Sequence, residues 1–330
     1  MRTASFGRRQ AFGLAALATP FIWRPSRSQP AQMTLKAGHG GQTGHATHAA
    51  MVRLAKTLQE RTSGQVRMDV YPDRQLGEER EMVEGLQLGT VDMTAVSTGP
   101  LVSFVPQVGV LDLPFLFRDS AHAYAVLDGE VGREIMGRFP GRGMVGLGYW
   151  ENGWRHMTSR NAVTTPADLR GMKLRTMQNP VHIAAFRNLG ASPVPMVWGE
   201  VFTSLGQGVI DAQENPLSVV YLNSLWEVQK HVTLTSHLYG PHLVLFSKSR
   251  WDKLPASARE VITAAMPEVT ASQRAEATRL DADAVAQLRA KGMTVSQVDI
   301  APFQQAAQAT YAQFKDRYDP ALVARIQAVK

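Results

Sequence analysis

Residues 171–176 read Gly-Met-Lys-Leu-Arg-Thr, and residues 211–216 read Asp-Ala-Gln-Glu-Asn-Pro. The first run predicts a short strand in which Leu174 faces one way and Arg175 the other, because side chains alternate across a strand. Asn179-Pro180 then predicts a helix start, with an N-cap residue and proline at the first helical position. An arginine at such a strand end presents a planar fork, which can hold a carboxylate through two parallel charge-assisted hydrogen bonds. The stretch therefore predicts a site for a small organic acid.

Strands and helices alternate on the N-terminal side of this stretch. The spacing of apolar residues predicts a strand over 66–71, a helix over 78–88 and a strand over 91–96. Such alternation indicates βαβ units and a largely parallel sheet. Leu88-Gly89-Thr90-Val91-Asp92 and Gln207-Gly208-Val209-Ile210-Asp211 share one pattern, a helix end, a glycine stop and a short strand. We interpret the pair as two similarly built lobes, each contributing one strand end to a shared cleft.

Three further segments bear on how such lobes are joined. Residues 144–149 predict a strand, and Trp150-Glu151-Asn152-Gly153 after it looks like a hinge. Asp119 is expected to cap a helix that continues to Phe139. Residues 255–291 are rich in alanine and predict a long helix that could lie across both lobes, with Pro267 expected to kink or break it.

The first 30 residues have the layout of an export signal. Arg8-Arg9 precede a modest apolar run over 11–23, which is too short to span a bilayer, and a polar segment follows. The adjacent arginines and the Ala/Gly-rich run resemble a twin-arginine signal, with an ordinary secretory signal as the alternative. Either one predicts a mature protein outside the cytoplasm, in a bacterial periplasm.

The basic balance of the chain comes mostly from this segment. Five of the 35 Lys and Arg residues lie within residues 1–30, which hold no acid, so 30 basic residues face 28 acidic ones in the remainder. A balance this close to neutral gives no reason to expect nucleic acid or an anionic membrane as a partner. The chain has no cysteine, which excludes thiolate nucleophiles and Cys-ligated metal or haem sites.

The sequence offers no anchor for a cofactor, a metal or catalysis. His45 and His48 are one helical turn apart and His39 is near in sequence, but no acid or cysteine accompanies them, and cap or surface histidines are commoner than zinc ligands. The run over 141–146 matches the dinucleotide fingerprint G-x-G-x-x-G, yet it precedes a strand instead of linking a strand to a helix. No nucleophile elbow, phosphate loop or zincin motif is present. We therefore expect no metal, no cofactor and no catalytic residue.

Three further residues are candidates for the acid site. Arg155 follows the expected hinge on an extended segment. Asn215 ends the second quoted run, where its side chain could donate to a ligand oxygen, and Trp198 follows a proline-bracketed turn that could form an apolar wall. Each has a structural alternative, which is an ion pair for either arginine, a cap for Asn215 and packing between elements for Trp198.

Several separated motifs share one resemblance. They are Gly-Met-Lys-Leu-Arg at 171–175, Leu-Gly-Ala-Ser-Pro-Val-Pro-Met at 189–196, Asp-Ala-Gln-Glu-Asn-Pro-Leu at 211–217, Glu-Val-Gln-Lys at 227–230, Tyr-Pro at 71–72, Gln-Leu-Gly at 75–77 and Arg-Glu-Met at 80–82. Together they resemble the solute-binding receptors of tripartite ATP-independent periplasmic (TRAP) transporters, in the dicarboxylate and sialic-acid (DctP-type) branch. The resemblance covers essentially the whole mature chain.

This resemblance implies an α/β fold, a two-lobe periplasmic binding protein with a hinge cleft and a long helix spanning both lobes. We expect residues 1–30 to be the export signal, 31–152 plus 241–280 to form lobe I, and 153–240 plus 281–330 to form lobe II. The resemblance also implies that Arg175 holds the ligand carboxylate. Arg155 and Asn215 would hold a second oxygen, and Trp198 would form an aromatic wall.

The first lobe departs from the sialic-acid subgroup of that family. Ser97 stands where those receptors carry glutamate, and Gly40 stands where they carry asparagine. His242 lies in the segment expected to return to lobe I. These differences argue against sialic acid and leave carboxylate capture untouched, so we expect His39, Ser97 and His242 to set selectivity.

The resulting hypothesis is a periplasmic receptor that captures a small organic acid and delivers it to the membrane permease subunits of a TRAP transporter. An exported enzyme acting on keto or hydroxy acids in the same cleft is the main alternative, because a twin-arginine signal often accompanies a cofactor. A receptor that reports to a membrane sensor is a third reading.

Overall fold

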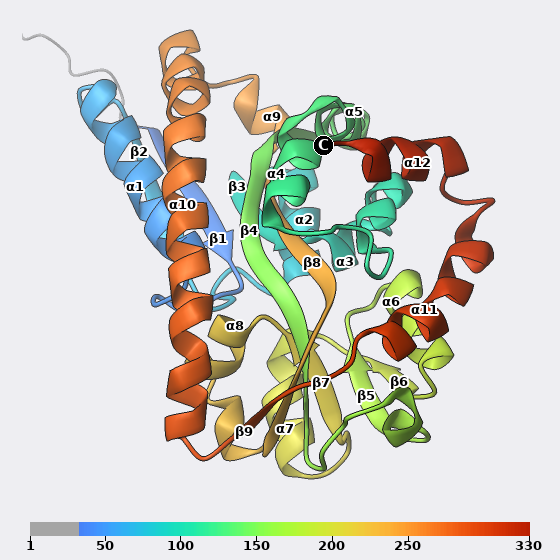
Figure 1. Ribbon diagram of the computed structural model, residues 1–330. Coiled ribbons are helices and arrows are strands. Elements are labelled where there is room, and N and C mark those ends of the chain that lie inside the picture. The colour runs from blue at the N-terminus through green and yellow to red at the C-terminus, as the bar shows by residue number, and fades with distance from the viewer. Residues whose placement is uncertain (1–32) are drawn as a thin grey trace, which may run out of the picture. The chain divides into compact units, whose positions relative to one another are not determined.

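The computed structural model describes residues 33–330 (Figure 1). The predicted export signal lies outside the described residues. None of the helices within 33–330 combines the length and apolar character needed to cross a membrane.

The first half of the described chain begins with a parallel β-α-β-α-β unit. It consists of β1 (Met33–His39), α1 (Ala46–Arg61), β2 (Val66–Tyr71), α2 (Glu79–Leu88) and β3 (Met93–Ser97). Strand β1 pairs in parallel with both β2 and β3. Helix α2 ends at Gly89, whose φ of 75° is the left-handed conformation that glycine adopts without a Cβ penalty.

The second half contains a unit of the same order. It consists of β5 (Lys173–Thr176), α6 (Pro180–Asn188), β6 (Ser192–Pro195), α7 (Val201–Gly206) and β7 (Ala212–Asn215), with β5 parallel to β6 and β7. Asp92 in the first unit accepts from the Lys36 amide at 2.7 Å and donates its own amide to the Lys36 carbonyl. Asp211 makes the same pair of bonds with Lys173, at 2.9 and 2.8 Å. The recurring Gly…Asp pattern therefore marks equivalent places in two similarly built units.

Two long antiparallel strands connect these units into one sheet. They are β4 (Met144–Ser159) and β8 (His231–Ser247), and the strand order is β2-β1-β3-β8-β4-β7-β5-β6, with β9 (Thr294–Gln297) also paired to β8. Residues 150–153, where the sequence predicted a hinge, lie inside the continuous strand β4. A register shift between Glu151 and Gly153 absorbs the extra residue, and Gly153 has φ 127°.

Helices cover both faces of the sheet in each half. The first half carries α3 (Thr98–Leu101), the 3₁₀ helix η1 (Pro106–Asp112), α4 (Ser120–Asp128), α5 (Glu130–Met136), η2 (Pro140–Arg142) and α9 (Lys248–Trp251). The second carries η3 (Pro166–Leu169), η4 (Trp198–Glu200), α8 (Leu217–Leu222) and η5 (Leu225–Glu227). Asp119 caps α4 as expected, but the predicted single helix to Phe139 is divided at Gly129, which has an extended ψ of −161°.

Helix α10 (Ala256–Ala290) runs the length of both halves and contacts α1 in one and α8 in the other (Figure 1). The prediction that Pro267 could break it is wrong, because the helix remains one 35-residue element around that proline. Loss of one backbone N–H is tolerated where the helix packs on both units along its length.

The C-terminal helices return across the sheet. α11 (Ala301–Phe314) contacts α6, whereas α12 (Pro320–Ala328) contacts α5 and buries Ile326 in the apolar cluster of the first half. The lobe boundaries remain a prediction; residues 320–328, which that prediction places in lobe II, pack on α5 and on the apolar cluster of the first half.

Candidate functional site

A small cavity lies where the strand ends of the two units face each other. It encloses about 60 Å³, and because an ordered water needs roughly 10–15 Å³ of such space, it suits a small molecule and not a peptide or an oligosaccharide. Its lining combines residues of both units and of the two connecting strands: Gly40, Gly41, Gln42, His45, Arg74, Glu78, Glu79, Ser97, Asn152, Arg155, Arg175, Met177, Trp198, Asn215, Val219, Leu222, Asn223 and His242. Six of the seven predicted site residues are among them. The exception is His39.

Arg175 is a buried cation without an acidic partner. It lies in β5, its exposed fraction is 3 %, and its Nε and Nη2 both donate to the Met196 carbonyl, at 3.1 and 2.9 Å. Among residues 33–330, no carboxylate oxygen lies within 4.0 Å of its guanidinium nitrogens. Burial lowers the pKa of Arg175 to about 10, which leaves it charged at neutral pH. A charge in this position is costly unless an anion joins it.

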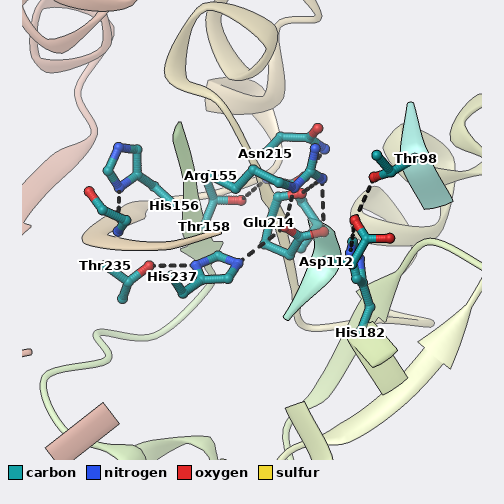
Figure 2. Close-up of polar contacts among 12 residues, drawn as sticks. Thr98, Asp112, Arg155, His156, Thr158, His182, Glu214, Asn215, Thr235 and His237 are labelled. Atoms are coloured by element: carbon teal, nitrogen blue, oxygen red, sulfur yellow. Dashed lines mark hydrogen bonds and ion pairs between the residues drawn. The ribbon is translucent and has the colours of Figure 1, made fainter. Parts of the chain in front are cut away.

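Arg155 differs, because it already has a partner. Its Nε donates to Glu214 Oε2 at 2.5 Å, and its Nη2 donates to Glu214 Oε1 at 2.8 Å and to the Glu214 carbonyl at 2.7 Å (Figure 2). Burial acts to raise the pKa of Glu214, but the Arg155 charge and hydrogen bonds from His237 and Arg155 hold it well below its usual range. The ion-pair alternative thus describes two of the three guanidinium nitrogens, although Arg155 still lines the cavity.

Two predicted residues extend the second-lobe wall. The Asn215 Nδ2 donates to Gln213 Oε1 at 2.7 Å, and Asn215 follows Glu214 directly in β7. The Trp198 ring lies 5.5 Å from the Arg175 guanidinium carbon, a cation–π distance. The aromatic group and the free cation therefore form one surface of the cavity.

The first-lobe wall contains an acid that sequence reasoning missed. Ser97 lines the cavity, but its amide and its hydroxyl both donate to Glu79 Oε1, at 2.8 and 2.9 Å. Burial raises the pKa of Glu79, while the Ser97 bonds and the nearby charges of Arg175 and Arg155 act the other way. Glu79 follows Gln75-Leu76-Gly77-Glu78 as the first residue of α2, where acidic residues are expected because they stabilise a helix start. Because an acid at a helix start is expected for that reason alone, the sequence did not mark Glu79 as a cavity residue.

The histidines have three different placements. His242 lines the cavity, its Nδ1 lies 3.2 Å from the Thr47 hydroxyl, and burial lowers its pKa, which keeps it neutral. His45, also missed as a lining residue, accepts from the Thr47 amide as N-cap of α1. His39 is fully buried outside the lining, with its Nε2 3.1 Å from Nδ1 of His48. The expectation that His39 contacts ligand lacks support, because His39 is not among the residues that line the cavity.

The family model of bacterial extracellular solute-binding proteins, family 7 (DctP), matches residues 37–317. The chain belongs to this family. It is a TRAP-type solute-binding protein, and its relatives are receptors of transporters, not enzymes.

Three relatives illustrate the range of the family. The 2,3-diketo-L-gulonate-binding periplasmic protein YiaO of Escherichia coli is 40 % identical over 263 residues, covering 79 % of this chain and 78 % of that one. A TRAP solute-binding protein from Polaromonas sp. JS666 bound to D-erythronate superposes with a TM-score of 0.88 at 37 % identity, over 91 % and 99 % of the two chains. One from Sulfurospirillum deleyianum with bound succinate has a TM-score of 0.87 at 35 % identity, over 91 % and 100 %. The family fold therefore serves both hydroxy acids and a dicarboxylate.

Proposed function

We propose that this receptor captures a small hydroxylated monocarboxylate, with Arg175 holding the carboxylate, and delivers it to the permease subunits of a TRAP transporter from the periplasm. The buried, acid-free guanidinium of Arg175 carries the proposal, since an incoming carboxylate supplies the charge and the acceptors that it lacks. Arg155 and Asn215 would hold a second oxygen, and Trp198 would cover the ligand. The expected N-terminal signal would provide export.

The charges around the cavity favour one ligand carboxylate over two. The Arg155 charge is balanced by Glu214, and Arg74 contacts Asp73 and Glu78, at 2.9 and 3.5 Å. Arg175 is the remaining lining cation, and Glu79 faces it from the other lobe. A second carboxylate near Glu79 would meet a like charge, whereas a hydroxyl could donate to it. The ligands of the YiaO and Polaromonas relatives, a diketo sugar acid and D-erythronate, are hydroxylated monocarboxylates.

Thermal unfolding with a panel of acids tests this function. The panel contains D-erythronate, longer aldonates, 2-keto sugar acids, succinate and malate, because a ligand that binds only the folded state raises the unfolding midpoint by mass action. We expect a hydroxylated monocarboxylate to raise it most.

The matched variants are Arg175→Ala, Arg175→Lys and, as a control on the exposed face of α10, Arg279→Ala. Loss of the charged fork should weaken binding by at least a hundredfold in Arg175→Ala, and lysine should restore little because it lacks the planar pair of donors. Arg279→Ala should bind as the wild type does. Near-native affinity in Arg175→Ala would contradict the assignment, and a shift with succinate alone would overturn the hydroxy-acid class.

A further inference from the structure

A contact between the lobes closes the cleft beside the cavity. Glu78, the residue before α2, extends Oε1 toward the second unit, where the Gly199 amide donates to it at 3.0 Å. Glu78 and Trp198, which precedes Gly199 in η4, line both the cavity and an adjoining space of about 40 Å³. The contact therefore lies at the cleft and not in the distant packing of either lobe.

Gly199 lacks a side chain that would obstruct the Glu78 carboxylate. A Cβ built on Gly199 would lie 2.5 Å from Glu78 Oε1, so a side chain at 199 would push the carboxylate away. The φ of Gly199 is not positive, so the close approach of the Glu78 carboxylate, and not the backbone conformation, favours glycine here. The same 3₁₀ turn places Trp198 against Arg175, so it joins the interlobe contact to the carboxylate-binding group.

The first lobe holds Glu78 in place with a strained turn. Arg74 Nε lies 3.5 Å from Glu78 Oε1, and Asp73 and Arg74 both have left-handed φ values, 49° and 61°. Non-glycine residues adopt that conformation at a cost, which the surrounding structure must offset. Here the Asp73 amide donates to the Gly41 carbonyl and the Arg74 amide to the His39 carbonyl, at 2.8 and 3.2 Å. The strained turn thus places the Arg74 guanidinium beside the Glu78 carboxylate, which reaches across the cleft to Gly199.

We propose that Glu78 and Gly199 form a clasp that sets how long the lobes stay closed over the ligand, an inference that rests on the proposed receptor function. Glu78 is a positioning residue in this scheme, and Arg175 remains the ligand-binding group. A single charged hydrogen bond that is replaced by water on opening contributes modestly. The clasp therefore slows release without preventing it, as delivery to a permease requires.

The test measures ligand dissociation by stopped-flow tryptophan fluorescence, with the acid found in the thermal panel. We expect Glu78→Ala and Gly199→Ala to release ligand about tenfold faster, with association changed by less than twofold, because the clasp holds the closed lobes and does not take part in the encounter with the acid. Glu78→Gln keeps an acceptor but loses the charge, and should fall between them and the wild type. The matched controls are Glu84→Gln, an exposed acid on the same helix that pairs with Arg80, and Gly141→Ala, where a Cβ meets open space. Unchanged dissociation in Glu78→Ala would overturn the proposal.

A second readout separates this idea from the choice of ligand. Because the chain has no cysteine, Lys56→Cys and Gln207→Cys allow one spin label on each unit, and pulsed electron paramagnetic resonance then gives the interlobe distances without ligand. We expect Gly199→Ala and Glu78→Ala to remove the shorter distances present in the parent. If no acid binds, the receptor assignment fails while these distances still decide on the clasp. An identical distribution in parent and variants refutes it.

Discussion

Arg155 and Arg175 carry the same charge at one cavity, yet their neighbours give them different tasks. Arg155 is fixed by Glu214, whose exposed fraction is 0 %, and His237 Nε2 approaches the same carboxylate at 3.2 Å (Figure 2). Arg175 rests on a carbonyl and an aromatic ring, with no carboxylate in contact within residues 33–330. A buried pair is costly to break from one side, since the remaining charge keeps its desolvation penalty. Arg155 is thus fixed by its ion pair with Glu214 while it still lines the cavity, whereas the charge of Arg175 is available to a ligand carboxylate.

Glu214→Gln tests this division of roles. Removing the charge should lower the free energy of unfolding by about 3–5 kcal/mol, because Arg155 would be left buried without its counter-ion. Urea denaturation of the variant and the wild type measures the loss. Glu276→Gln, which removes an exposed partner of Arg279 on α10, serves as the control and should be indistinguishable from the wild type. Equal behaviour of the two variants would show that the Arg155 pair adds no more than a surface contact.

At the scale of elements, α1 begins on a titratable cap. His45 Nδ1 accepts from the Thr47 amide at 3.2 Å, which requires the neutral ring. Burial lowers the pKa of His45 to about 4 and that of His39 to about 3. Between about pH 6.5 and these values the unfolded chain binds more protons than the folded one. Stability is therefore full above the unfolded pKa and falls as the pH drops.

His45→Asn should reduce this pH dependence without removing the cap. Asparagine can present an oxygen to the same amide and is a favoured N-cap, but it does not titrate. Urea denaturation at pH 7.5, 6.5, 5.5 and 4.5 should show that the free energy of unfolding of the wild type falls by a few kcal/mol toward low pH. In the variant the slope of this free energy against pH should be smaller, by the equivalent of about one bound proton. At pH 7.5 the two proteins should be close in stability. Parallel pH profiles would show that His45 titrates alike in the folded and unfolded chains.

The elements also show what the sequence could and could not predict. Apolar spacing and glycine stops predicted the β-α-β elements over 66–96 and, in the second unit, the strand at 171–176 with the helix that follows it, since each depends on local pattern. Strand β6 was not predicted, because its prolines indicate a turn. Arg175 was a candidate because it lies near the end of a predicted strand. The pairing of Arg155 with Glu214 could not be predicted, because the two residues are 59 apart and meet only through the pairing of β4 with β7. The bulge that keeps β4 continuous likewise depends on its partner strand β8. Glu79 was missed because a helix start and a ligand-facing acid look alike in sequence.

On the scale of the whole molecule, the two units share one arrangement of hydrogen bonds, in which an aspartate bonds to the backbone of a lysine on the neighbouring strand. Asp92 ties the start of β3 to Lys36 of β1, and Asp211 ties the start of β7 to Lys173 of β5. The two differ in one contact, because Asp92 Oδ1 also accepts from Arg250 at 2.5 Å. If the units are built alike but packed around separate cores, removing one aspartate should lower the free energy of unfolding by an amount that does not depend on the other aspartate.

Asp211→Ala should lower the free energy of unfolding by about 1–2 kcal/mol, the cost of leaving one amide without its acceptor, and Asp92→Ala should cost more because Arg250 also loses its partner. Asparagine at 211 keeps the acceptor and should be nearly neutral, whereas Asp92→Asn should retain the Lys36 bond and lose only the ionic contact. Urea denaturation of the singles and of the double alanine variant completes the cycle. The two sites share no partner, so the losses should add within about 0.5 kcal/mol. A double variant well outside that sum would mean that the lobes stabilise each other through the shared strands β4 and β8, and closure would then be coupled to the integrity of both units.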